Sequence, residues 1–315
     1  MIINFSVENF GSIKEKQTLS FLANKSDHLE DYYIIEPIKG LRLNKLALIY
    51  GANASGKTTV LKALDFIRKI CTEPFDKKTE KFDFEPFLFD EDTPNQNTKF
   101  ELEFVQNGIR YFYEVELNKN CIVKEKLYNF NPNKALVFER TTDEQKELTS
   151  VKFGSKIPKK KSLEESLEIF TLWNNTVIAG FLKGNIDLLE LKDVSYWFIH
   201  IMLRLILPSE DLSNIFLPRL IENKQYLNTF LTFFKKSDFI FSSCFSRKQS
   251  ICSFMFPAIV SRFFFCAGST SGTIHSITPS SFKSFAVIFM IPAASFARFP
   301  SFQRIDANPS GERME

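Results

Sequence analysis

The chain lacks the cysteine patterns on which small secreted domains and zinc sites depend. Its five cysteines are odd in number and form no C-x-x-C pair, which argues against a disulfide framework and a zinc site. The N-terminus, Met-Ile-Ile-Asn-Phe, has neither a basic region nor a cleavage site, so it does not resemble a signal peptide. We therefore expect a cytoplasmic protein.

Strong net charge and long apolar runs are also missing. The formal net charge is +3 over 315 residues, which is too small to indicate nucleic-acid binding by itself. The strongest apolar run, Tyr196 to Leu207, is shorter than a membrane span and contains His200 and Arg204. A buried helix is the better interpretation, with His200 packed or partly exposed and not a ligand, and no membrane contact is expected.

The segment from residue 239 to 315 contains no leucine, tyrosine or tryptophan. Leucine is normally among the commonest residues, and here Phe and Ser dominate instead. Three interpretations stay open: a membrane-associated segment, a divergent native domain, or non-native coding, which we favour. Phe codons read as Lys or Glu codons on the opposite strand, where two Leu codons read as stops. The reverse strand of a charged coding sequence would therefore have this composition.

One motif with a defined chemistry stands out. Residues 51–59 read Gly-Ala-Asn-Ala-Ser-Gly-Lys-Thr-Thr and fit G-x-x-x-x-G-K-[ST], the pattern of a phosphate-binding P-loop. Leu46 to Tyr50 is an apolar run typical of a buried strand, and Thr59 to Cys71 has apolar residues at helical spacing. The order of strand, loop and helix is the context that the motif requires.

The residue types of this loop suit a nucleotide with a divalent cation. Glycines let the backbone turn and approach an anion closely, and loop amides with the positive end of the helix hold a β-phosphate. Lys57 is expected to reach the β- and γ-phosphates as the catalytic lysine, and the Thr58 hydroxyl to ligate Mg²⁺. A Gly/Ser turn without a ligand is the alternative. The predicted nucleotide site comprises Gly51, Ala52, Asn53, Ala54, Ser55, Gly56, Lys57, Thr58 and Thr59.

Most of the chain before residue 155 predicts strands. Asn107-Gly108 is a strong hairpin signal between two of them, and Asn131-Pro-Asn133 is a predicted turn between the next two. The predicted strands are Ile2 to Val7, Thr18 to Ala23, Tyr32 to Ile35, Leu46 to Tyr50, Lys99 to Gln106, Ile109 to Leu117, Ile122 to Phe130 and Ala135 to Arg140.

Residues 156–238 predict helices. The run of four lysines between 156 and 161 is interpreted as a solvated loop, with a phosphate-backbone contact as the alternative. A capping box at Ser162 begins a helix that continues to about residue 181, where Gly180 and Gly184 interrupt it. Further helices are expected over 188–207, before Pro208, and from 212 or 220 to 236. Their predicted core residues are Trp173, Trp197, Phe198, Leu203 and Leu231.

The opening of the chain resembles a known class of ATPases. A first strand, the turn Glu8-Asn-Phe-Gly-Ser-Ile-Lys14 and then the P-loop are similar to ABC-type heads of the SMC and RecF class. The closest resemblance is to the AAA-family ATPases of bacterial abortive-infection and other phage-defence systems. It implies an α/β fold: an ABC-type P-loop head with an antiparallel β-subdomain and a helical insertion.

The resemblance also implies ligands and partners. They are ATP and Mg²⁺, a second copy in a homodimer of heads, and an effector that is often a nuclease. In that class the turn after the first strand lies near the nucleotide, so Phe10 to Ile13 are expected at the adenine or phosphate site, with an ordinary hairpin turn as the alternative. A glutamine that senses Mg²⁺ cannot be assigned, because neither Gln96 nor Gln106 lies in a motif.

The groups that such heads need for hydrolysis are not found in the sequence. No run of four apolar residues ends in Asp-Glu, and Ser269 to Gly272 only loosely resembles a signature loop; in phosphoryl transfer such groups position water and neutralise developing charge. The resemblance therefore covers Met1 to Ile240. We predict a P-loop core with its β-subdomain at 1–155, a helical insertion at 156–238, and a non-native or disordered tail at 239–315.

The predicted function is ATP binding by a truncated head that hydrolyses ATP weakly or not at all. The first alternative is a non-enzymatic partner-binding module with a relic P-loop. A GTPase or kinase is the second, and it lacks its specificity motif, because Asn44-Lys-Leu-Ala47 has no Asp in the fourth position of Asn-Lys-x-Asp.

Overall fold

The computed structural model describes residues 1–207 and 285–289, apart from 26–28, 53–54, 156 and 158–160. The chain divides into two units. The first contains residues 1–203 and 286–315 and holds the P-loop. The second, Arg204–Phe285, lies almost entirely outside the described residues. The predicted third helix, with Leu231, and most of the unusual tail lie outside them too.

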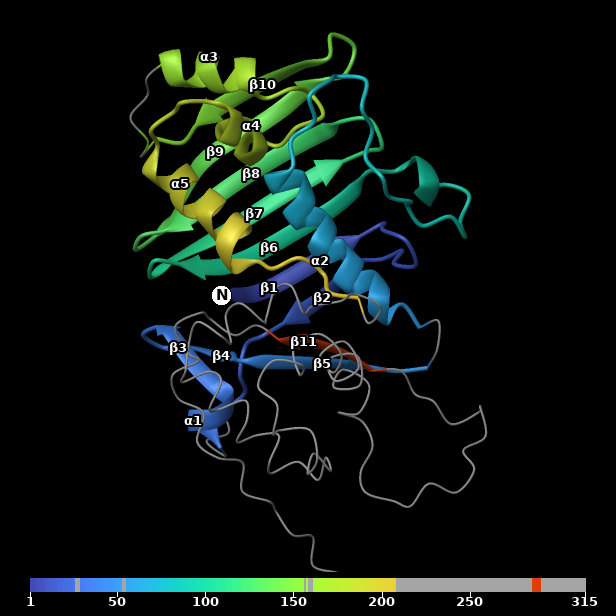
Figure 1. Ribbon diagram of the computed structural model, residues 1–315, viewed down its shortest axis with the longest axis vertical. Coiled ribbons are helices and arrows are strands. Elements are labelled where there is room, and N and C mark those ends of the chain that lie inside the picture. The colour runs from blue at the N-terminus through green and yellow to red at the C-terminus, as the bar shows by residue number, and fades with distance from the viewer. Residues whose placement is uncertain (26–28, 53–54, 156, 158–160, 208–284, 290–315) are drawn as a thin grey trace, which may run out of the picture. The chain divides into compact units, whose positions relative to one another are not determined.

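A seven-stranded antiparallel sheet forms the body of the first unit (Figure 1). Its strand order is β10-β9-β8-β7-β6-β1-β2, so the N-terminal hairpin extends the sheet that the later strands build. All neighbouring pairs are antiparallel. The strands are β1 (Ile2–Glu8), β2 (Gln17–Ser20), β6 (Thr98–Gln106), β7 (Ile109–Leu117), β8 (Ile122–Phe130), β9 (Lys134–Asp143) and β10 (Leu148–Phe153).

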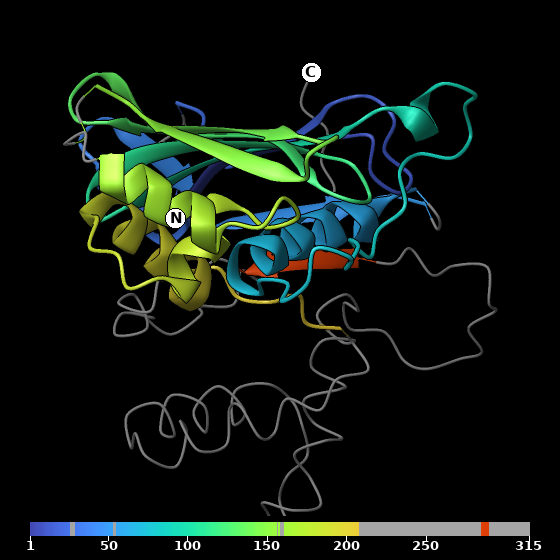
Figure 2. The ribbon, with the colours of Figure 1, turned by 90° about the horizontal axis from the view of Figure 1, so that it is seen from above.

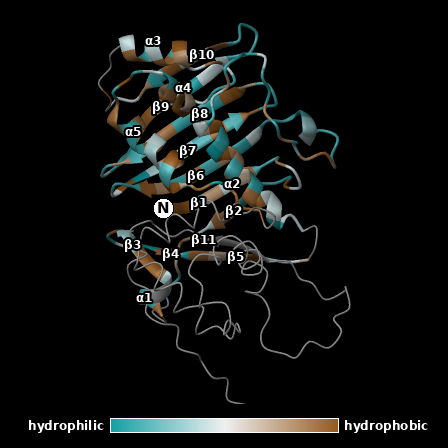
Figure 3. Cartoon of the chain, in the orientation of Figure 1, coloured by the Kyte–Doolittle hydropathy of each residue, from teal (hydrophilic) through white to brown (hydrophobic). Residues whose placement is uncertain are grey.

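The sheet has one buried face and one polar face, because apolar and polar residues alternate along its central strands (Figure 3). On β7, Tyr111 and Tyr113 are fully buried on the inner face. On the polar face, cross-strand ion pairs join neighbouring strands, as between Lys126 and Glu139 at 2.9 Å. Opposite charges on neighbouring strands stabilise the pairing.

Helices cover the inner face of the sheet (Figure 2). The P-loop helix packs its apolar side onto the strands, and its Phe66 ring lies 5.7 Å from that of Phe100 and 5.5 Å from that of Phe10. The helical elements are α2 (Lys57–Thr72), α3 (Lys161–Phe170), α4 (Val177–Lys183), α5 (Leu189–Tyr196) and the π-helical turn η2 (Trp197–Ile201).

The remaining elements are short. Helix α1 (Glu30–Tyr33) precedes the hairpin of β3 (Ile34–Ile38) and β4 (Leu41–Asn44), and a 3₁₀ turn, η1 (Thr93–Asn95), precedes β6. Strand β5 (Leu46–Tyr50) pairs with β11 (Phe285–Phe289) in a two-stranded sheet. Contrary to the expectation of a buried strand, β5 leaves Leu48 57% and Tyr50 76% exposed.

The prediction of one helix from Ser162 to about Phe181 is wrong. The chain forms α3 and α4 with an irregular segment, 171–176, between them, and Ser162 lies inside α3 and not at its N-cap. Gly180 does not interrupt a helix but lies within α4. It is required there because a Cβ would come within 2.1 Å of Thr171 Oγ1.

Other differences concern helix ends and burial. The helix expected over 188–207 ends at Ile201, and the strand predicted from Tyr32 begins at Ile34 because α1 occupies the preceding turn. Strand β10 was not predicted. Trp197 and Phe198 are buried as expected, whereas Leu203 is 72% exposed and Trp173 is only half-buried.

Candidate nucleotide-binding site

The P-loop motif lies at the junction of β5 and α2, as its sequence context predicts. Strand β5 ends at Tyr50 and α2 begins at Lys57. Gly56 caps the helix with a φ of +85°, a conformation that favours glycine. A Cβ at this position would lie 3.0 Å from Ser12 Oγ, so the loop and the first hairpin approach closely. Asn53 and Ala54 lie outside the described residues.

Lys57 points back into the loop. Its side chain is 9% exposed, and its Nζ donates to the carbonyls of Gly51 at 3.1 Å and Ala52 at 2.5 Å. A third contact reaches Ser55 Oγ at 3.4 Å. The ammonium group is therefore held against the carbonyl oxygens of the loop, whose N–H groups are the ones that bind phosphate in a P-loop.

The neighbouring threonines differ in environment. Thr58 is exposed on the first turn of α2, where its hydroxyl is open to a hydrated cation. Thr59 Oγ1 is hydrogen-bonded to Ser12 Oγ at 2.9 Å. This bond joins the P-loop helix to the turn that follows β1.

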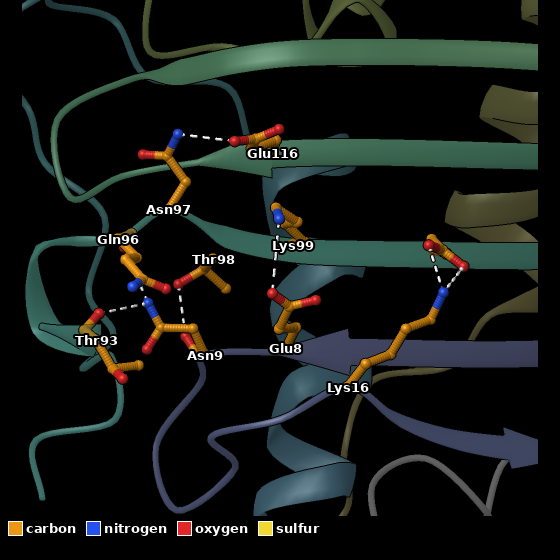
Figure 4. A network of polar contacts seen from close by, with 10 residues as sticks. Glu8, Asn9, Lys16, Thr93, Gln96, Asn97, Thr98, Lys99 and Glu116 are labelled. Carbon is orange, nitrogen blue, oxygen red and sulfur yellow. Dashed lines mark hydrogen bonds and ion pairs between the residues drawn. The ribbon is translucent and has the colours of Figure 1, made fainter. Parts of the chain in front are cut away.

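That turn is organised by Asn9 (Figure 4). Asn9 is 2% exposed and has a φ of +56°. Its Nδ2 donates to the carbonyls of Thr93 and Gln96, both at 2.9 Å, and its Oδ1 accepts from Phe87 N at 2.9 Å. Thr98 Oγ1 donates to the Asn9 carbonyl at 2.7 Å. Every polar group of this side chain thus fixes the loop that leads into β6.

The rest of the turn lies between the sheet and the P-loop helix. Phe10 points into the core, where its ring stacks on Phe84 with centroids 5.7 Å apart. Gly11 has a φ of +56°, and a Cβ there would lie 3.0 Å from Thr59 Cγ2. The Asn-Phe-Gly-Ser sequence is therefore explained by close packing of the turn against α2.

A cavity of about 570 Å³ opens between the P-loop and the β1–β2 hairpin. Ser12 and Ile13 of the turn lie on one side of it, and Gly56 and Lys57 on the other. The full lining is Phe5, Val7, Ser12, Ile13, Lys14, Glu15, Gln17, Thr18, Leu19, Ile49, Tyr50, Ser55, Gly56, Lys57 and Val60. Its volume is in the range of small-molecule sites.

Of the expected turn residues, Ser12 and Ile13 line this cavity. Phe10 and Gly11 do not line it: Phe10 packs on Phe84 in the core, and Gly11 lies against Thr59 of α2. No local pattern in the sequence indicates that β2 or Tyr50 lines the cavity. Strand β2 comes to lie beside the P-loop only because it pairs with β1.

An ion pair fixes the rim of the cavity. Lys14 Nζ lies 2.9 Å from a carboxylate oxygen of Asp90. The hydrogen bond with Asp90 raises the pKa of Lys14, and hydrogen bonds from Thr93 and Lys14 lower the pKa of Asp90. Both shifts favour the charged forms, so the ion pair persists near neutral pH.

The residues present fit a phosphate group with Mg²⁺. A lysine, a close-approach glycine and an exposed threonine hydroxyl meet at one helix start, and Mg²⁺ keeps most of its waters and needs few protein ligands. Among the described residues there is no cluster of three or more His, Cys, Asp or Glu that could hold a metal ion by itself. Gln96 contributes its main-chain carbonyl to Asn9, and Gln106 ends β6.

Comparison with known families decides the class of this site. The family model of an AAA domain, described as putative AbiEii toxin of a type IV toxin–antitoxin system, matches residues 46–234, more than half of the chain. The chain belongs to this family. It is an AAA-family ATPase of the abortive-infection kind, and its P-loop is part of a nucleotide-binding ATPase-type module for which the family implies ATP.

The family match begins at β5, so it covers the P-loop and extends through the helices α2 to α5. The resemblance inferred from the opening of the chain is thereby confirmed. No curated protein and no solved structure matches. None of the helices in the part of the chain that the structure describes is long and apolar enough to cross a membrane.

Proposed function

We propose that the cavity between the P-loop and the β1–β2 hairpin binds ATP with Mg²⁺. Lys57 binds the β- and γ-phosphates, and the loop amides bind the β-phosphate. The Thr58 hydroxyl supplies the protein ligand of Mg²⁺. The observation that supports this most directly is the position of Lys57, which is held at the centre of a loop beside a cavity of nucleotide size.

Phosphate oxygens would take over the lysine contacts that the carbonyls of Gly51 and Ala52 now make. Both sets of bonds have a charged donor, but a phosphate oxygen also carries negative charge, so its attraction to the ammonium group is the stronger one. The exchange therefore favours the bound loop, and it changes the partners of the first residue of α2.

We further propose that this chain, by itself, hydrolyses ATP slowly. Glu15 is the sole acid among the described residues that line the cavity, and it lies on the hairpin. An attacking water needs a positioned base, and removal of such a group lowers phosphoryl-transfer rates strongly. In the abortive-infection setting that the family suggests, two such heads would associate and act on an effector such as a nuclease.

The test measures ATP binding and turnover on matched variants. A fluorescent ATP analogue is titrated, with Mg²⁺, into the wild-type chain, Lys57→Ala and Lys62→Ala. Lys62 is an exposed lysine on the same helix that does not line the cavity, so it controls for loss of charge. We expect Lys57→Ala to weaken binding at least tenfold and Lys62→Ala to leave it unchanged.

The outcomes separate the alternatives. Binding lost in Lys57→Ala, with little phosphate released by the wild-type chain, supports the proposal. Equal binding by all three proteins would support a relic P-loop in a partner-binding module. Robust turnover by the isolated wild-type chain would overturn slow hydrolysis and require a catalytic acid, either Glu15 or a residue outside the cavity lining.

A further inference from the structure

Four consecutive side chains, Trp173 to Thr176, bind the main chain that leaves the P-loop helix; we name them the 173–176 clasp. Asn175 pairs with both peptide groups of Phe75, accepting from its N–H at 2.8 Å and donating to its carbonyl at 3.0 Å. Asn174 Nδ2 donates to the carbonyls of Lys77 at 2.9 Å and Glu80 at 3.0 Å. A contiguous piece of sequence thus serves one backbone segment about a hundred residues away.

Trp173 and Thr176, at the two ends of the clasp, also bind main-chain carbonyls of α2 or of the segment that follows it. Trp173 Nε1 donates to the carbonyl of Lys78 at 2.8 Å. Thr176 Oγ1 donates to the carbonyl of Ile70, in the last turn of α2, at 3.0 Å. The same Thr176 oxygen accepts from Ala179 N at 3.1 Å and so caps the N-terminus of α4. One hydroxyl therefore joins the end of α2 to the start of α4.

Helix α4 is tied to the same segment at its other end. Lys183 Nζ donates to the carbonyl of Phe75 at 2.6 Å and pairs with Asp76 at 2.8 Å. On the sheet side, Glu125 accepts from Val177 N at 2.8 Å and from the hydroxyl of Tyr113 at 2.9 Å. Cys71 of α2 in turn lies 3.5 Å from that hydroxyl. Helix α4 is thus bound to α2 and its exit at both ends.

Breaking these hydrogen bonds would cost free energy. The side chains of Asn174, Asn175 and Thr176 are at most 2% exposed; the bond from Thr176 to Ile70 is buried, and those of Asn174 and Asn175 are partly buried. Each buried donor or acceptor left without a partner costs about 1–3 kcal/mol. The end of α2 and α4 are therefore expected to move together.

The P-loop helix can carry a displacement over this distance. Helix α2 has 16 residues and so spans roughly 24 Å. Its first turn lines the cavity with Lys57 and Val60, and its last turn carries Ile70, which the clasp binds. A change at the first turn can reach α4 through one helix and the hydrogen bonds of the clasp.

We propose that the 173–176 clasp transmits nucleotide binding at the start of α2 to α4, and that Asn175 is its central positioning residue. The inference rests on the proposed ATP site. It assigns a conformational role to a sequence, Trp-Asn-Asn-Thr, that no part of the nucleotide chemistry uses.

Hydrogen exchange with and without ATP and Mg²⁺ tests the proposal. In the wild-type chain, ATP slows exchange in peptides of the P-loop and α2 and also in peptides covering 177–183. In Asn175→Ala the slowing stays at residues 55–65, and the slowing at 177–183 falls by about fivefold or more. Lys183→Met, a milder change at a partly exposed site, is expected to reduce it in the same direction.

Lys192→Met is the matched control, because Lys192 lies on α5 and pairs with Asp187, away from the clasp. It should retain the full wild-type response. Undiminished slowing at 177–183 in both Asn175→Ala and Lys183→Met would overturn the proposal, as would a wild-type chain in which 55–65 responds to ATP and 177–183 does not. If 55–65 does not respond either, the ATP site itself is refuted and the coupling with it.

Discussion

At the scale of single residues, Asn9 shows why a short turn motif has the composition it has. Its side chain binds three main-chain groups of the loop between Phe87 and Gln96, and its backbone has a positive φ that Asn tolerates better than most residues. The turn can then place Ser12 against Thr59 of the P-loop helix. The residue acts on the site through geometry and does not touch the cavity.

Replacing Asn9 with Ala is expected to lower the free energy of unfolding by about 3 kcal/mol, because it orphans three buried backbone groups and strains the left-handed conformation. Urea unfolding measures this change. Asn133→Ala, at an exposed turn position, should change it by less than about 0.5 kcal/mol. Equal effects of the two substitutions would contradict the role given to Asn9.

Glu125 is a second residue whose burial has a measurable consequence. It is fully buried, and this burial raises its pKa from 4.5 to about 7, although Arg140 and the N–H of Val177 partly offset the effect. Between these two values the folded protein holds a proton that the unfolded chain releases. The stability that this proton confers is present at low pH and is lost as the pH rises from 4.5 to 7.

Comparison of the wild-type chain with Glu125→Gln isolates this effect, since all other titrating groups are shared. The difference in unfolding free energy, wild type minus variant, should be larger near pH 5 than near pH 8 by up to about 3 kcal/mol. Urea unfolding at the two pH values provides the measurement. A difference that does not vary with pH would show that the pKa of Glu125 is not shifted, and a difference that grows toward pH 8 would show that it is lowered.

At the scale of elements, α3 covers the edge of the sheet that β10 forms. Strand β10 is the last strand in the order, so every second N–H points away from its neighbour β9. Glu168 accepts from Val151 N and Glu164 from Phe153 N, both at 2.9 Å. The two glutamates are four residues apart on one helix face, which matches two strand amides on the same edge. An edge covered in this way is protected from pairing with another chain.

The double substitution Glu164→Ala with Glu168→Ala should free this edge. We expect faster hydrogen exchange in the peptide 148–153, a loss of about 2 kcal/mol in unfolding free energy, and a greater tendency to aggregate. Glu165→Ala is the control, since Glu165 is exposed and its contact is with Lys161 on the same helix. If the control accelerates exchange as much as the double variant, the carboxylates do not protect the edge.

At the scale of the whole unit, one hydrophobic core joins the N-terminal sheet, the P-loop helix and the helices α3 to α5. Its buried residues run from Ile2 to Met202. A ligand that binds only the folded state therefore stabilises all of these elements together. The domain boundary expected at residue 155 stays a prediction, and so does the nature of the tail.

Removal of Mg²⁺ tests the metal role of Thr58 at this scale. ATP at a hundred times its dissociation constant should raise the unfolding free energy by about 2.7 kcal/mol, and a chelator should remove much of that gain in the wild-type chain. In Thr58→Ala, thermal unfolding with ATP should depend far less on Mg²⁺. Thr72→Ala, at the far end of α2, serves as the control. An unchanged Mg²⁺ dependence in Thr58→Ala would remove Thr58 from the metal site.

Local patterns in the sequence were sufficient for much of the architecture. The bounds of β5, β7 and β8 agree residue for residue with the predicted strands, because apolar alternation and turn signals are properties of neighbouring residues. The P-loop was recognisable for the same reason: its glycines and lysine must be adjacent in sequence to surround one phosphate. The resemblance to the family was inferred from this segment and the turn before it, and the family match over residues 46–234 confirms it.

Only the tertiary structure decided which distant segments meet. The gap between α3 and α4 exists because Gly180 packs against Thr171 and the clasp binds the chain after α2, and no local periodicity encodes either contact. The cavity likewise needs β2 and the Asn9 turn beside a loop some forty residues later. Residue type and spacing determine the P-loop motif, but the free energy of long-range packing determines which strands and helices surround it.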